Sequence, residues 1–149
     1  MKKILWVMFA TILSLVSCSN DNKGDIDGLC EPMEISSKEV SLDTSKKEGI
    51  FINIPKGGET FSLQVNNYDD WWLSSLSEKF GQNGKFKLNK QSRKNNPKVS
   101  KDGWYQVEVG SNKVKCVISE NDQAAPRTIQ LVMTGGDIFQ TFYIVQAAE

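Results

Sequence analysis

The sequence contains no histidine, and this absence excludes several kinds of chemistry. Without an imidazole, neither a Ser-His-Asp nor a Cys-His catalytic arrangement can be built, and the commonest metal ligand of proteins is missing. The adjacent carboxylates Asp69 and Asp70 could in principle act as a glycosidase pair. Neighbouring acids before a strand are more often turn residues, and we interpret them so. We therefore expect a protein that is not an enzyme and that needs neither a metal nor another cofactor.

An excess of charge is also lacking, because 18 basic and 18 acidic residues give a formal net charge of zero. Such a balance gives no reason to expect nucleic acid as a partner. Long apolar runs are scarce as well. The run from Ile4 to Leu13 is shorter than the ~20 residues that a spanning helix needs, and no second long run follows.

The first residues are typical of an export signal. Lys2 and Lys3 precede the apolar run, which Leu15-Val16-Ser17-Cys18 closes. These last four residues resemble the bacterial lipobox, in which the cysteine takes a diacylglycerol and signal peptidase cuts just before it. The alternative is an ordinary signal peptide that happens to contain a cysteine.

These features predict three parts. Residues 1–17 form a lipoprotein signal peptide, residues 18–32 hold the lipidated Cys18 and a polar flexible tether, and residues 33–149 form the domain. The lipid would be the membrane contact, and it would place the protein on the outer membrane, facing the cell surface or the periplasm.

Cysteine is scarce, with three residues in all. If Cys18 carries a lipid, Cys30 and Cys116 remain in an oxidising compartment and could form a disulfide. The alternative is two unpaired thiols, since Cys116 falls on the apolar face of an expected strand.

Apolar residues alternate with polar ones through most of the domain, which is typical of half-buried strands. The clearest alternating runs are 50–54, 61–65, 105–109, 114–118, 129–133 and 138–146. Residues 34–36 are a further expected strand, and Ser74–Phe80 could form a turn or two of helix. Gly135-Gly136-Asp137 predicts a hairpin between the last two runs. The pattern predicts an all-β, antiparallel sandwich.

The stretch from Gly81 to Gly103 departs from this pattern, because it is rich in Asn and Lys and poor in apolar residues. We expect a long basic insertion there, with a short hairpin around Phe86 and Leu88. It could meet an acidic polysaccharide or a lipid phosphate, although a solvated loop is the ordinary explanation.

Several stretches together resemble the BACON domain, an immunoglobulin-like module common in Bacteroidetes surface proteins. They are the Gly57-Gly58 turn with Phe61–Val65, Trp71–Ser74, Trp104–Val107, Val114–Asn121, Arg127–Leu131 and Phe142–Gln146. The resemblance covers most of residues 35–146, and the basic insertion departs from the usual domain. It implies an immunoglobulin-like sandwich, a surface location and the carbohydrate binding suspected for the family.

Tryptophan offers the expected sugar-stacking surfaces. Because adjacent strand residues face opposite sides, Trp71 should point into the core and Trp72 outward. We predict Trp72, Tyr68 and Trp104 as glycan contacts, while core or edge packing is the structural alternative. Asn121 and Arg127, which bracket a loop, are interpreted as a structural clamp.

Two functions remain in view. The first is a non-catalytic surface lipoprotein that binds a glycan or polysaccharide weakly. The second is a structural spacer or assembly subunit of an outer-membrane complex, without a glycan site and with a protein partner that the sequence does not identify.

Overall fold

The structure is a computed structural model that describes residues 30–91 and 99–148. Residues Pro32–Glu149 form a compact unit. The predicted signal peptide, Cys18 and nearly all of the tether lie outside the described residues. The described part contains ten strands and no helix, which confirms the all-β prediction.

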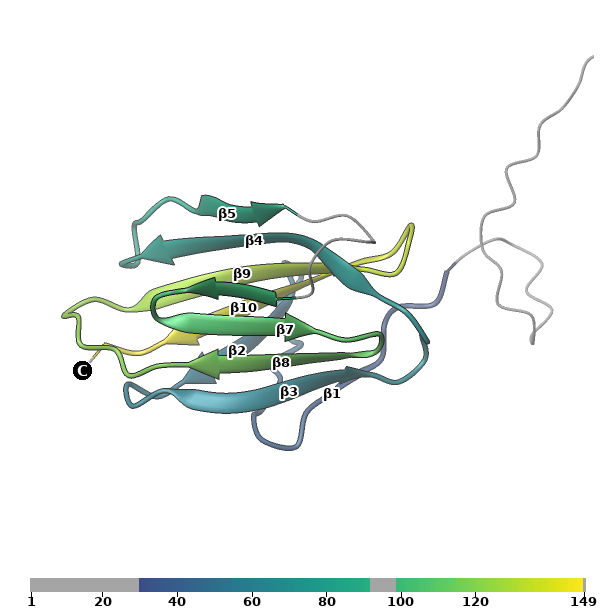
Figure 1. The fold of residues 1–149 in the computed structure, drawn as a ribbon, viewed down its shortest axis with the longest axis horizontal. Coiled ribbons are helices and arrows are strands. Elements are labelled where there is room, and N and C mark those ends of the chain that lie inside the picture. Colours follow the sequence, from purple (N-terminus) through teal and green to yellow (C-terminus); the bar gives the residue numbers. More distant parts are fainter. Residues whose placement is uncertain (1–29, 92–98, 149) are drawn as a thin grey trace, which may run out of the picture. The chain divides into compact units, whose positions relative to one another are not determined.

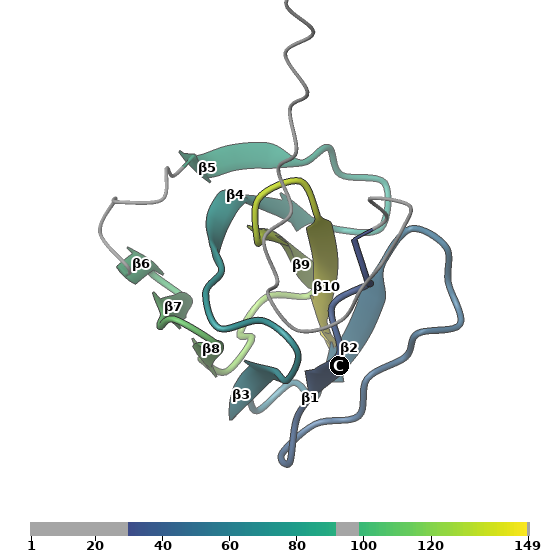
Figure 2. The same cartoon turned by 90° about the vertical axis from the view of Figure 1, so that its right-hand side faces the viewer.

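The strands form two five-stranded sheets (Figure 1). Sheet A has the order β1-β3-β8-β7-β6, with β1 (Ile35–Ser36), β3 (Glu59–Val65), β8 (Lys113–Ile118), β7 (Tyr105–Val109) and β6 (Val99–Asp102). Sheet B has the order β2-β10-β9-β4-β5, with β2 (Ile50–Ile54), β10 (Phe139–Gln146), β9 (Arg127–Thr134), β4 (Trp72–Phe80) and β5 (Lys87–Gln91). The view in Figure 2 shows the two sheets as separate layers.

The prediction of purely antiparallel sheets is wrong in one place. β2 runs parallel to β10, with Tyr143 opposite Phe51, whereas the other strand pairs are antiparallel. A parallel pair needs a long connection, and here nearly the whole domain lies between the two strands. Sheet B is therefore mixed.

The core lies between the sheets and uses the inward residues of both. Phe61 and Leu63 of sheet A and Leu131 and Ile144 of sheet B are essentially inaccessible to solvent. Trp71 is 2% exposed and meets the edge of the Phe142 ring at 6.3 Å between centroids, as its predicted inward position requires. Period-two alternation thus gives each sheet one buried face.

The predicted closing hairpin is confirmed. β9 and β10 pair along their full length, from Thr134 opposite Phe139 to Arg127 opposite Gln146. Gly136 has φ near +106°, which favours glycine at this position of the turn.

The expected turn of helix at Ser74–Phe80 is wrong, since these residues belong to β4. A register shift between Leu73 and Ser75 against β9 leaves both Leu73 and Leu76 buried. Without a bulge, buried residues in a strand are two positions apart. The bulge here separates the buried Leu73 and Leu76 by three positions, a spacing that is also typical of a helix.

Arg127 and Asn121 form the expected clamp at one end of the sandwich. Arg127 donates through Nε to the Gln146 side chain at 2.8 Å and through one terminal nitrogen to the carbonyls of Ser119 and Glu120. Asn121 donates to the carbonyls of Ala125 and Ala147, at 3.1 and 2.9 Å.

Gln146 completes the clamp, because its amide donates to Pro55, Lys56 and Ser119. The three side chains are buried, and a buried polar group is costly unless its hydrogen bonds are made. The clamp therefore ties the end of β10 to the β2–β3 turn and to the loop before β9.

Candidate functional site

The outward faces of the two sheets differ in chemistry. On sheet A the outward positions of β3, β7 and β8 are mostly polar or charged: Thr60, Ser62, Gln64, Gln106, Glu108, Lys113 and Lys115, with Val117 among them. Such a face is ordinary for a sheet in contact with water. It offers no aromatic surface to a ligand.

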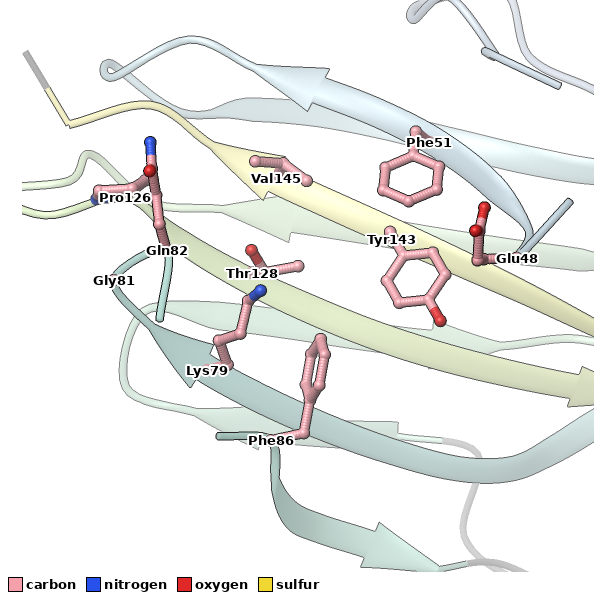
Figure 3. Close-up of a pocket in the computed structure, with 10 residues that line it drawn as sticks. All are labelled: Glu48, Phe51, Lys79, Gly81, Gln82, Phe86, Pro126, Thr128, Tyr143 and Val145. Atoms are coloured by element: carbon pink, nitrogen blue, oxygen red, sulfur yellow. The ribbon is translucent and has the colours of Figure 1, made fainter. Parts of the chain in front are cut away.

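The outward face of sheet B instead carries a shallow groove of about 440 Å³. Figure 3 shows its walls, which come from β2, β4, β9, β10 and the β4–β5 connection. The lining residues are Glu48, Phe51, Lys79, Gly81, Gln82, Phe86, Pro126, Thr128, Tyr143 and Val145. A volume of this size lies within the range of small-ligand sites.

The parallel pairing of β2 with β10 places two aromatic rings side by side. Phe51 and Tyr143 are register partners, and their rings stack with centroids 4.6 Å apart and planes inclined by 19°. The Lys46 ammonium lies 4.0 Å from the Phe51 centroid. A stack this close leaves no room for an ammonium between the rings, so Lys46 covers the opposite face of Phe51.

The far side of Tyr143 faces the hollow of the groove. Phe86 contacts it there at a tilt, with centroids 6.2 Å apart and planes inclined by 53°. Lys79 reaches up from β4 beside Phe86, with its Nζ 5.1 Å from that ring's centroid, and Thr128 lies on the floor between the walls (Figure 3). A flat ligand entering here would meet Tyr143 and Phe86 rather than Phe51.

Hydrogen-bonding groups surround these rings. The Gln130 amide donates to the Tyr143 hydroxyl at 3.1 Å and so holds the ring in place. Gln82, Thr128, Glu48 and the Lys79 ammonium line the groove with donors and acceptors. Apolar rings with a few convergent polar groups are what a small-molecule site requires.

The structure gives Trp104 contacts within the fold. Its indole nitrogen donates to Glu78 at 3.1 Å, the Arg127 guanidinium lies 4.2 Å from its ring centroid, and Phe80 and Tyr105 meet it edge-on. Burial disfavours the charged form of the Arg127 guanidinium and lowers its pKa. The contact with the Trp104 ring offsets part of the cost of burying this charge. Trp104 thus joins β7 to the clamp.

Trp72 and Tyr68 lie at the opposite end of the sandwich from Trp104. Trp72 is opposite Thr134, whereas Phe80, which contacts Trp104, is opposite Arg127. The nine-residue strand between these ends spans about 26 Å at roughly 3.3 Å per residue. Trp72 is half-buried rather than fully exposed, and Tyr68 packs against the core. The three predicted glycan contacts therefore do not form one surface.

The predicted disulfide between Cys30 and Cys116 is not formed. Cys116 is a free cysteine, fully buried between Val114 and Ile118 on the inward face of β8. Burial in this apolar environment raises the pKa of its thiol to about 12, which keeps it protonated and inert.

Residues 30–91 and 99–148 contain no group of three or more Cys, Asp or Glu side chains arranged to hold a metal ion. The same residues contain no helix long and apolar enough to span a membrane.

The groove was not predicted from the sequence, although two of its strands contain continuous apolar runs that could have indicated it. Phe51 lies between Ile50 and Ile52, and Tyr143 lies between Phe142 and Ile144, so each strand has an aromatic residue at an outward position where a polar one would be usual. Continuous apolar runs indicate strands that are covered, or available to be covered, on both faces.

The chain is thus an all-β protein of two packed sheets, one of which bears an aromatic groove on its outer face. Among solved structures, it is similar to a protein from Bacteroides thetaiotaomicron determined by NMR, with a TM-score of 0.61 and 30% identity. The match covers 85% of this chain and 96% of that one, so the chain belongs to the same family as the Bacteroides protein. No protein-family model matches the chain, and no curated protein matches it.

Proposed function

We propose that this protein is a non-catalytic carbohydrate-binding protein and that the groove on the outer face of sheet B is its binding site. The observation that carries the proposal is the pair of contacting rings, Tyr143 and Phe86, that line an open groove together with amide, hydroxyl and charged groups. Sheet A, built from the same alternation, has no comparable surface among its described residues.

A sugar suits this combination because it is amphipathic. The apolar face of a pyranose ring packs on a flat aromatic ring, while its hydroxyls exchange hydrogen bonds with side chains at the rim. Tyr143 and Phe86 supply the rings, and Gln82, Thr128 and Glu48 supply the polar partners. Because the groove is shallow, we expect dissociation constants on the order of millimolar to tens of micromolar.

The sheet order supports an immunoglobulin-like assignment of the fold. β1, β3, β8 and β7 correspond to the A-B-E-D order of such domains, and β10, β9 and β4 to their G-F-C order. β5 then extends the second sheet beside β4 as an additional strand. Together with the resemblance to the BACON domain, this order supports a carbohydrate-binding module of that kind.

The same proposal places the protein on the outer membrane through a lipid on Cys18. Many copies on one membrane would multiply weak contacts with a polysaccharide. The test compares wild type with Cys18→Ala in cells labelled with a clickable fatty acid. A thioether-linked lipid survives reduction, so the label should persist on the wild type in reductant and be absent from the variant. Equal labelling of both proteins would contradict the lipidation.

The binding site is tested with the purified full-length protein on a broad glycan array, followed by titration of any ligand found. Phe86→Ala removes one wall and should weaken binding at least tenfold with little change in melting temperature, because Phe86 is 38% exposed and lies outside the hydrophobic core. Gln64→Ala on the outer face of sheet A is the matched control and should bind normally. Trp72→Ala tests the site predicted from the sequence.

The outcomes separate the alternatives. Loss of binding in Trp72→Ala with normal binding in Phe86→Ala would move the site to the other end of sheet B. Absence of binding by the wild type would favour a spacer or assembly subunit. That second function has its own support, because Phe139 and Leu88 are 62% and 56% exposed and could contact a protein partner.

A further inference from the structure

The charges around the groove are unevenly distributed. Lys79 lies inside it and Lys46 covers Phe51 at its edge, while Lys47 and Lys85 are exposed in the segments that precede β2 and Phe86. The acids from residue 43 to β2 are Glu48, which lines the groove, and Asp43, while Glu39 accepts a hydrogen bond from the backbone of Ser62 on sheet A. The side chain of Asp43 accepts two hydrogen bonds from Ser45, which lower the pKa of its carboxyl. The rim therefore carries more cationic than anionic groups.

The position of Lys79 determines the preference for a charged ligand more than the number of charges at the rim does. Its side chain rises from the floor strand β4 between Phe86 and Thr128, so its ammonium is beside the ring on which a sugar would stack (Figure 3). Glu48 lies near Phe51 and Tyr143, on the other side of the groove (Figure 3). A ligand with an anionic substituent has one orientation that brings this group to Lys79 and away from Glu48.

We infer that the groove binds an acidic glycan, with Lys79 contacting a carboxylate or sulfate on the sugar that packs against the exposed surfaces of Tyr143 and Phe86. This inference rests on the proposed carbohydrate-binding function and names its ligand class. A charge-assisted hydrogen bond is stronger than a neutral one, so the anionic group adds affinity that the rings alone do not provide. The lysines at the rim would also attract a polyanion over a longer range, in a manner that salt weakens.

The experiment is an NMR titration of the full-length protein with a matched pair of ligands. The first is an oligogalacturonate, and the second is the same oligomer with its carboxylates methyl-esterified, which removes the charge and little else. A sulfated galactose oligomer and its unsulfated form distinguish sulfate from carboxylate. We expect at least one anionic oligomer to bind about tenfold or more tightly than its neutral counterpart, and to shift resonances of Tyr143 and Thr128.

Variants locate the charge effect. Lys79→Gln should reduce the affinity for the anionic oligomer about tenfold and should remove the preference over the neutral form. Lys115→Gln changes the same charge on the outer face of sheet A and should leave both affinities unchanged. Lys79→Arg should retain the preference, since it keeps the positive charge.

The results distinguish the two proposals. Equal binding of charged and neutral oligomers, or an unchanged preference in Lys79→Gln, would overturn the acidic ligand but leave the carbohydrate site in place. If none of the four oligomers and no glycan on the array binds, both proposals fail together.

Discussion

The two sheets resemble each other inside the sandwich and differ outside it. Inward, both present mainly large apolar residues, such as Phe61 and Leu63 on β3 and Ile129 and Leu131 on β9. Outward, sheet A presents Ser62, Gln64 and Lys115, whereas sheet B presents Phe51 and Tyr143. Folding requires the inward residues, because they form the shared core. It makes no such demand on the outward ones, so the difference between the outer faces points to function.

The aromatic face is costly to maintain, since exposed apolar patches invite nonspecific association. Sheet B limits that cost locally. Lys46 and Lys79 lie over the rings of Phe51 and Phe86, and Gln130 engages the hydroxyl of Tyr143. These polar groups keep the rings partly covered in water and remain available as partners for a ligand.

The largest effect on stability should come from truncating one of the inward apolar residues that the two sheets have in common. Leu131→Ala removes a fully buried side chain from the middle of sheet B, and we expect it to lower the free energy of unfolding by about 2–5 kcal/mol. Val132, the next residue, points outward and is half-buried, so Val132→Ala should cost about 1 kcal/mol or less. Denaturant melts of both variants measure the contrast. Equal costs would mean that the inward and outward faces of β9 have been exchanged.

The inward face was readable from the sequence because alternation depends on neighbours in the chain. The buried apolar positions in β3, β7, β8 and β9 could be predicted from the residues on either side of them. The β9–β10 hairpin was readable for the same reason, since Gly135-Gly136-Asp137 lies directly between its strands. β4 was misread because its bulge at Leu73–Ser75 breaks the local period.

The outward site was not readable in the same way, because its members meet only in three dimensions. Phe51 and Tyr143 come together through parallel pairing of strands that are separated by most of the domain. Phe86 and Lys79 join them from the turn and strand at the other side of sheet B. The sequence prediction favoured Trp72 and Trp104 because tryptophan has the largest ring, yet Trp104 is engaged within the fold and Trp72 lies at the other end of the sandwich.

The next prediction concerns the Cys116 thiol, a titratable group in the core, and tests whether it is shielded from water. The thiol of Cys116 has a pKa raised to about 12 by burial, whereas an unfolded cysteine titrates at roughly 8.5. Above the unfolded pKa, the unfolded state loses a proton that the folded state keeps. The free energy of unfolding should therefore fall as pH rises from about 9 toward 12, by up to about 1.4 kcal/mol per pH unit.

The measurement is the stability of wild type and of Cys116→Ala between pH 7 and pH 10.5. Lysines and tyrosines titrate in this range in both proteins, so the difference between the two curves isolates the thiol. The curves should run parallel up to about pH 8 and converge above it, because only the wild type carries the buried thiol. Parallel curves throughout would show that Cys116 is in contact with water.

The smallest expected effect concerns the difference between the outer faces of the two sheets, and it is measured on the pair of rings on sheet B. Phe51 and Tyr143 stack as register partners, so a double-mutant cycle with Phe51→Ala and Tyr143→Ala should give a coupling energy of about 0.5–1.5 kcal/mol. Ser62 and Lys115 are outward register partners on sheet A and form the matched control cycle, for which we expect a coupling within about 0.3 kcal/mol. Denaturant unfolding of seven proteins, with the wild type common to both cycles, supplies both values. Similar couplings on the two sheets would mean that the rings do not stack in solution, and the wall of the groove formed by Tyr143 would then lack the support that fixes it. A clear difference would show that sheet B holds Tyr143 in position before any ligand arrives, which reduces the entropy lost on binding.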